Sequence, residues 1–196
     1  MDDATRLRSI LDCAEVAIVV AQDGVIKYAN RKTCELTSAQ PELLLAHPFT
    51  DFIHPEDRDR VLDSHHRRIS GESPESPYSF RLFTGKGATR WVEISASTIQ
   101  WEGRTATVSF LTDITERKKQ ESALIESERK YRTLFQTMVN GFVLHEIILD
   151  STGHACDYRF LEVNPTFERI IGLKAENLIG RTVRQVLPNV ESYWIQ

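Results

Sequence analysis

The most constraining feature of this sequence is an internal repeat. Asn164-Pro165 stands in the second half where Asn30-Arg31 stands in the first. A shift of 134 residues (164 − 30) then aligns the two segments without a gap for about twenty-five positions. Apolar positions fall on apolar positions across this shift: Leu36 on Ile170, Leu44 on Leu178, Phe52 on Val186 and Ile53 on Leu187. The repeat indicates two copies of one domain-sized module.

The first copy contains strand patterns, several helix patterns and then strand patterns again. Residues 16–20 and 25–29 read as strands around Asp23-Gly24, a dipeptide that favours hairpin turns. Short helices are predicted from Asn30 and from Pro41, followed by a brief apolar patch at 49–53. His54-Pro55-Glu56-Asp57 begins a longer helix that ends near Gly71. Three more strands are predicted at 78–83, 88–100 and 104–112.

A charged connector follows the last of these strands. Asp113 is predicted to cap a helix over 116–138, with Glu116 reaching back to close a capping box. Leu124, Tyr131 and Met138 recur every seven residues along it, which gives a modest apolar seam. Ahead of the first copy, residues 1–13 are expected to form a short amphipathic helix.

Composition and charge bound the class of protein. Hydrophobic residues make up 41% and charged residues 27% of the chain, as in ordinary globular proteins. A net charge of −4 leaves no basic surface for nucleic acid. No apolar run approaches the roughly eighteen residues of a membrane span. Three scattered cysteines favour a reducing, cytoplasmic setting, either for the whole protein or for the cytoplasmic region of a membrane-bound sensor.

The order and spacing of several short motifs carry a family resemblance. In the first copy they are Asp23-Gly24, Tyr28-Ala-Asn30, Glu35-Leu-Thr37, His54-Pro-Glu-Asp57, Tyr78-x-Phe-Arg81, Arg90-Trp-Val-Glu93 and Asp113-Ile-Thr-Glu-Arg-Lys118. In the second copy they are Phe160-Leu-Glu-Val-Asn-Pro165, Phe167-Glu168 and Gly180-Arg181. With these motifs the chain resembles tandem PAS sensor domains, the first of them ending in a PAC motif.

The resemblance implies an α+β fold: a five-stranded antiparallel sheet with short helices and one long helix enclosing a cavity over one face. We therefore expect a first PAS domain at 14–115, a signalling helix at 116–138 and the N-terminal half of a second PAS domain at 139–196. The second copy would lack its last three strands, so its first strand would leave apolar surface bare.

Strand alternation gives each strand two faces, and the resemblance chooses which one meets the cavity. It places toward the cavity Ile18, Val20, Phe80, Leu82, Val92, Ile94, Thr107 and Leu111, with Leu36, Leu44, Phe52, Val61, His65 and Ile69 closing it from the helices. Two interpretations stay open: a core filled by its own side chains, or a ligand site whose mostly apolar lining offers few groups to orient a polar effector.

The opposite face of the sheet is expected to be apolar. It would carry Trp91, Ala106, Val108 and Phe110, a patch that the N-terminal helix, the connector or a second subunit would cover. Residues on this face and along the connector are the candidates for a homodimer interface: Trp91, Val108, Phe110, Leu124, Tyr131, Phe135 and Met138.

Cofactor chemistry finds little support in the sequence. Phe49 stands where light-sensing relatives of the LOV type carry their reactive cysteine, which excludes a flavin photoadduct in this unit. His65 and His66 lie on the predicted long helix, yet the haem ligand of oxygen-sensing relatives aligns about a turn earlier, so haem is a minor alternative. His145-Glu146 lacks the second histidine of a zinc-protease motif, because Leu149 occupies that position. No metal ligand set, catalytic set or cofactor is predicted.

The resemblance implies a non-catalytic sensory region of a larger signalling protein. A histidine kinase is the preferred parent protein, and a diguanylate cyclase is the alternative. A change in the cavity would pass through Asp113, Ile114 and Thr115 to the connector helix as a shift between populated states. A ligand-free dimerisation module and a haem-based oxygen sensor are the alternatives. The expected partners are a second copy of the chain and a downstream output domain, without nucleic acid or direct membrane contact.

Overall fold

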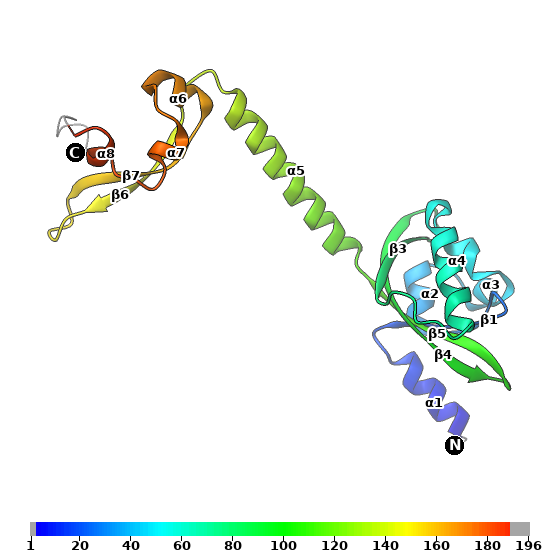
Figure 1. Cartoon of the computed structure of the whole chain (residues 1–196). Coiled ribbons are helices and arrows are strands. Elements are labelled where there is room, and N and C mark those ends of the chain that lie inside the picture. Colours follow the sequence, from blue (N-terminus) through cyan, green and yellow to red (C-terminus); the bar gives the residue numbers. More distant parts are fainter. Residues whose placement is uncertain (1–2, 189–196) are drawn as a thin grey trace. The chain divides into compact units, whose positions relative to one another are not determined.

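A computed structural model describes residues 3–188 (Figure 1). Residues 1–2 of the predicted N-terminal helix and residues 189–196 of the predicted second copy lie outside this range. The chain divides into two compact units between Glu121 and Ser122. Helix α5, Thr115–Thr137, runs across this division.

The first unit is built on a five-stranded antiparallel sheet, which confirms the predicted fold class. Its spatial order is β2-β1-β5-β4-β3. The strands are β1 (Ala17–Gln22), β2 (Val25–Ala29), β3 (Tyr78–Phe83), β4 (Thr89–Trp101) and β5 (Arg104–Asp113). The predicted hairpin turn has positive φ at both Asp23 and Gly24, as a two-residue turn between twisted strands requires.

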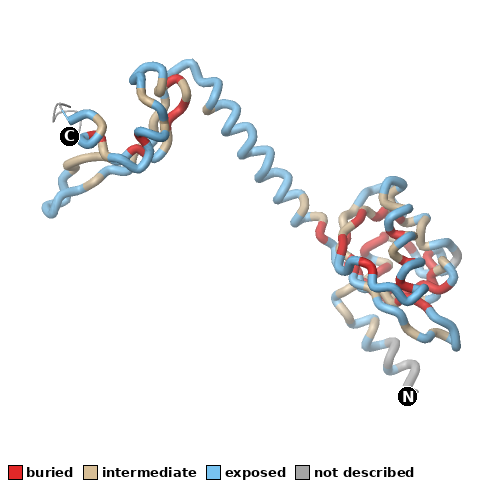
Figure 2. The backbone as a smooth tube through the Cα atoms, in the orientation of Figure 1, coloured by how far each residue is buried: buried red, intermediate tan, exposed pale blue. Residues whose placement is uncertain are grey.

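Helices cover one face of this sheet. They are α2 (Arg31–Thr37), α3 (Pro41–Ala46), the 3-10 turn η1 (Phe49–Phe52) and α4 (Pro55–Ile69). Helix α1, Asp3–Asp12, precedes β1. Pro55 at the first position and Glu56 and Asp57 in the first turn favour the start of α4. The buried residues of the first unit concentrate in the sheet and in these helices (Figure 2).

A buried asparagine ties the sheet to the helices. Asn30 caps α2, and its Oδ1 accepts hydrogen bonds from Thr33 N at 3.1 Å and from Ile18 N at 2.9 Å. Its Nδ2 donates to the carbonyl oxygens of Leu11, at the end of α1, and of Val16, just before β1. One side chain therefore fixes the start of a strand, the start of a helix and the end of the preceding helix.

The second unit contains two paired strands and short helices. Strands β6 (Val143–Leu149) and β7 (Ala155–Val163) form a two-stranded antiparallel sheet. Helices α6 (Pro165–Ile171), α7 (Ala175–Leu178) and α8 (Val183–Val186) follow. The core here is small, since Phe160, Val163, Leu178 and Val183 make up its buried cluster. Strand side chains such as Ile147, at 65% exposure, remain open to solvent.

The repeated asparagine has the same geometry in the second unit. Asn164 caps α6, and its Oδ1 accepts from Phe167 N and Phe142 N at 2.8 Å each. Its Nδ2 donates to Asn140 O at 2.9 Å, beside the end of α5. Asn30 and Asn164 are both fully buried. The internal repeat is thus a repeat of structure as well as of sequence.

Replacing Asn30 with Ala should strongly destabilise the first unit. The change leaves buried donors and acceptors of three backbone segments without partners, at a cost of roughly 3 kcal/mol or more. Urea unfolding of Asn30→Ala against wild type measures this cost. The exposed Asn177→Ala serves as the control, and equal midpoints for the two variants would contradict the role of Asn30.

Candidate functional site

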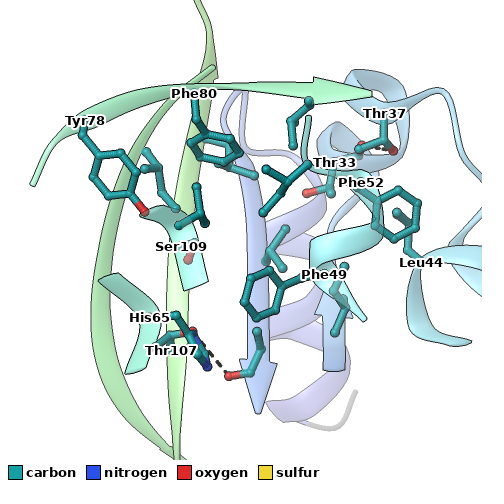
Figure 3. Close-up of a pocket in the computed structure, with 18 of the residues that line it drawn as sticks. Thr33, Thr37, Leu44, Phe49, Phe52, His65, Tyr78, Phe80, Thr107 and Ser109 are labelled. Atoms are coloured by element: carbon teal, nitrogen blue, oxygen red, sulfur yellow. Dashed lines mark hydrogen bonds between the residues drawn. The ribbon is translucent and has the colours of Figure 1, made fainter. Parts of the chain in front are cut away.

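A cavity of about 80 Å³ lies between the sheet and the helices of the first unit. Its lining comes from every element around it: Val19, Ala21, Ile26, Thr33, Thr37, Leu44, Phe49, Phe52, Ile53, Val61, His65, Arg68, Tyr78, Phe80, Leu82, Ile94, Thr107, Ser109 and Leu111. In Figure 3, Thr33, Thr37, Leu44 and Phe52 gather on one side, and His65, Tyr78, Thr107 and Ser109 on the other.

Several polar groups in the lining already have partners. Thr33 Oγ1 lies 3.0 Å from Ile18 O, and Thr37 Oγ1 lies 2.8 Å from Thr33 O. His65 Nδ1 lies 3.3 Å from Thr107 Oγ1, a contact drawn in Figure 3. Burial lowers the pKa of His65, and electrostatic interactions with His66 and Arg68 lower it further. His65 is therefore neutral at pH 7 and belongs to the wall of the cavity.

Most of the residues expected to face the cavity do line it in the structure. These are Leu44, Phe52, Val61, His65, Phe80, Leu82, Ile94, Thr107 and Leu111. Leu36 and Val92 are buried in the adjoining core instead. Ile69 is 37% exposed near the end of α4, so the expectation that it closes the cavity is wrong.

The expected orientation of β1 is also wrong. Val19 and Ala21 line the cavity, whereas Ile18 and Val20 point to the other face, opposite Phe110 and Val108 of β5. All six residues of β1 are buried. The strand therefore shows no alternation of polar and apolar residues from which its orientation could be read.

The cavity does not fit haem or flavin. About 80 Å³ is far below the roughly 300 to 1,000 Å³ of pockets that hold drug-sized ligands. Phe49, at the position of the LOV cysteine, is part of the lining and lies 4.9 Å from the His65 ring, centroid to centroid. Either cofactor would have to displace such side chains. The volume suits a molecule of only a few non-hydrogen atoms.

The last strand of the sheet leads directly into α5. Asp113 ends β5, and its carboxylate accepts from Thr115 N and from Arg90 Nη1, both at 2.9 Å. Trp91 N donates to Thr115 Oγ1 at 3.0 Å, and Ile114 N donates to Trp91 O at 2.9 Å. Ile114 is buried. The junction is thus held by β4 as well as by its own turn.

The capping box predicted at this junction is not formed. The Glu116 carboxylate lies 2.8 Å from Lys119 Nζ, one turn further along α5, and does not return to Asp113. Partial burial opposes ionisation of Asp113, yet hydrogen bonds from Thr115 and Arg90 outweigh it and hold the pKa of this carboxyl below its usual value. Asp113 is accordingly ionised at neutral pH.

A second set of contacts, not predicted from the sequence, connects α4 to the junction. Arg81 on β3 forms an ion pair with Asp57 at the start of α4, with N···O distances of 2.9 and 3.0 Å. These bonds lower the pKa of Asp57. The Arg81 guanidinium also lies over the Trp91 ring, 5.5 Å from its centroid. Helix α4, which lines the cavity, is thereby linked to the strand that holds Thr115.

The residues expected at an interface lie in three settings. Trp91 is half-buried beneath Arg81, whereas Val108 and Phe110 lie on the outer face of the sheet, with Phe110 40% exposed. Ala106, on the same face, is fully buried. On α5, Leu124 is 69% exposed, and Met138, just after the end of α5, is 39% exposed.

Two of the connector residues also contact the second unit. Tyr131 donates to Glu162 at 2.8 Å, and its ring stacks on that of Phe135. Phe135 in turn meets Phe142 edge to face, with ring centroids 5.5 Å apart. The C-terminal part of α5 therefore packs on the rest of the second unit, to which it belongs.

Other kinds of site find no support in the described part of the chain. Between residues 3 and 188, no group of three or more His, Cys, Asp or Glu side chains is placed to hold a metal ion. Over the same range, no helix is both long and apolar enough to cross a membrane.

The first unit thus combines a five-stranded antiparallel sheet, helices over one face with a cavity beneath them, and a helix that leaves the last strand. A family described as "PAS fold" matches residues 5–114, and one described as "PAS domain" matches residues 129–195. The chain belongs to the PAS family, with two copies in tandem.

Relatives connect the chain to sensor histidine kinases. Sporulation kinase E of Bacillus subtilis is 26% identical over 187 residues, which covers 95% of this chain and 23% of the kinase. A blue-light-activated histidine kinase of Brucella ovis is 27% identical over 145 residues, 69% of this chain and 28% of the kinase. The chain thus spans about a quarter of each of these proteins.

Solved structures support the fold alone. The PAS domain of a Colwellia psychrerythraea protein superposes with a TM-score of 0.52 at 19% identity, covering 59% of this chain and 99% of that one. An RNA-binding light-oxygen-voltage receptor gives a TM-score of 0.51 at 20% identity, covering 65% and 37% of the two chains.

The buried His65 should make stability depend on pH. Its pKa is lowered in the folded state, so the unfolded chain takes up a proton near pH 6.5 that the folded chain resists. Stability should fall as the pH drops from 7 to about 5.5, and His65→Asn should lose part of that dependence. Thermal unfolding between these pH values measures it, with the exposed His66→Asn as the control. Identical pH profiles for wild type and His65→Asn would refute the assignment.

Proposed function

We propose that this chain is the sensory and signal-relaying region of a histidine kinase, in which a change in the first cavity alters the position of α5. The observation that carries the proposal is that β5 both lines the cavity and leads into the junction with α5. Thr107, Ser109 and Leu111 line the cavity, and Asp113 ends the same strand at the junction. The kinase output is inferred from homology to two kinases, of which this chain spans about a quarter.

The relay would work through the contacts that hold the junction. A ligand that displaces Leu111 or Ser109 shifts β5, and the shift reaches Asp113 two residues beyond Leu111. The displacement of β5 is the first route. A second route runs from α4 through Asp57 and Arg81 to Trp91, whose N–H donates to Thr115 Oγ1. Both routes end on the first turn of α5. The result is a change in the populations of two arrangements of the helix.

Asp113→Ala in the full-length kinase should uncouple its output from its stimulus. The variant removes the acceptor of Thr115 N and the partner of Arg90, while every cavity residue stays in place. Stability should fall by only about 1 kcal/mol. Autophosphorylation with and without stimulus measures the coupling, and the exposed Asp59→Ala provides a matched control. A normal stimulus response in Asp113→Ala would refute the relay.

We further propose that the chain forms a homodimer through the outer face of its sheet and the seam of α5. Phe110 on β5 and Leu124 on α5 expose large apolar surfaces that water does not favour. Pairing of α5 with its copy would bury Leu124 and Met138 in a parallel seam. A dimer without any ligand role is the second candidate function, and these exposed side chains are the observation that favours it.

Phe110→Arg should separate the two subunits without unfolding either one. The arginine would place a charge in the middle of the proposed interface and leave the core unchanged, because Phe110 lies outside it. Sedimentation at several protein concentrations measures the shift toward monomer, and the exposed Thr105→Arg, on the other face of the same strand, is the control. A folded, fully dimeric Phe110→Arg would exclude this face from the interface.

A further inference from the structure

One charged side chain in the cavity wall has no counter-ion among the residues that the structure describes. Arg68 is 7% exposed and lines the cavity. Its Nη1 lies 3.4 Å from Ser64 O, a weak contact within its own helix. Its Nη2 is buried and has no hydrogen-bond partner. A buried guanidinium in this state is costly for a protein and calls for an anion.

Within the described part of the chain, no acidic residue lines the cavity beside Arg68. The acids nearest in sequence are engaged elsewhere, since Asp63 and Glu72 both pair with the exposed Arg67. Because His65 is neutral, Arg68 is the one fixed charge among the described lining residues.

The position of Arg68 on α4 directs it to the polar side of the cavity. It follows His65 by three residues and Val61 by seven, so all three share one helix face. His65, Tyr78 and Ser109 lie on the same side in Figure 3, with Leu44 and Phe52 opposite. One side of the cavity therefore offers hydrogen-bonding groups. On the other side the hydroxyls of Thr33 and Thr37 are already bonded to backbone carbonyl oxygens, so that side offers mainly apolar surface.

We propose that the first cavity binds a small organic monocarboxylate, with its carboxylate on the Arg68 guanidinium and its alkyl group among Leu44, Phe52 and neighbouring side chains. A guanidinium matches a carboxylate in shape and can donate two parallel hydrogen bonds to it. A volume of about 80 Å³ holds on the order of five to eight water-sized groups, which fits acids of three to six carbons. The inference rests on the proposed function only in treating this cavity as the sensing site.

Titration calorimetry of the 196-residue chain with butanoate, butanamide, butan-1-ol and inorganic phosphate tests the proposal. Butanoate should bind on the order of tenfold or more tightly than the isosteric amide, because only the acid forms charge-assisted bonds with Arg68. Arg68→Met should abolish this preference, Arg68→Lys should keep part of it, and Arg67→Met should keep all of it. Equal binding of acid and amide, binding of phosphate alone, or no binding of any probe would overturn the proposal.

Stability without ligand gives an independent readout. Removing an unpaired buried charge should leave Arg68→Met melting at or above the temperature of wild type, whereas added butanoate should raise the melting temperature of wild type only. A lower melting temperature for ligand-free Arg68→Met would mean that Arg68 has a structural partner, and would overturn the proposal. Binding is measured without any kinase output. A normal stimulus response in Asp113→Ala would therefore not contradict butanoate binding. Failure of butanoate to bind would likewise not contradict the relay.

Discussion

A fully buried asparagine organises each of the two units. Asn30 joins the end of α1, the segment before β1, the first residues of β1 and the cap of α2 through one amide. Asn164 makes the corresponding bonds to Phe142, Phe167 and Asn140. An amide serves here because it offers an acceptor and two donors in one plane, and every one of these buried backbone groups needs a partner. The position of the helices over the sheet, and hence the existence of the cavity, follows from this anchor.

The start of α5 and the segment after its end are each held by contacts within their own unit. Its first turn is held by Asp113 and by the backbone of Trp91, while the segment just after it is bonded by Asn164 and by Thr166, whose Oγ1 lies 2.7 Å from Met138 O. A helix of this kind can carry a displacement because its own hydrogen bonds resist bending over 23 residues. A change in the cavity would start this displacement, since β5 and α4 both line the cavity and both lead to the junction.

Much of this could be predicted from the sequence, and the failures have physical causes. The sequence of β3 puts Phe80 and Leu82 on one face and Ser79 and Arg81 on the other, and the resemblance chose the face that meets the cavity. β1 is buried on both faces, so nothing in Val19 or Val20 distinguishes inside from outside. Arg68 resembles any solvated charge on a helix, and only the packing of β3 and β4 against α4 reveals its burial. The Asp57–Arg81 pair joins residues 24 apart, which no local pattern indicates.

Filling of the cavity is proposed to change the hydrogen bonds at the start of α5. Ser109→Leu fills the cavity from β5 and imitates a bound ligand, while Thr105→Leu places the same side chain at an exposed position on that strand. Amide hydrogen exchange of Ile114, Thr115 and Lys118 compares the two variants, since these N–H groups report the bonds of the junction. The account predicts a change in their protection in Ser109→Leu alone. Unchanged exchange at all three amides, in a folded Ser109→Leu protein, would contradict it.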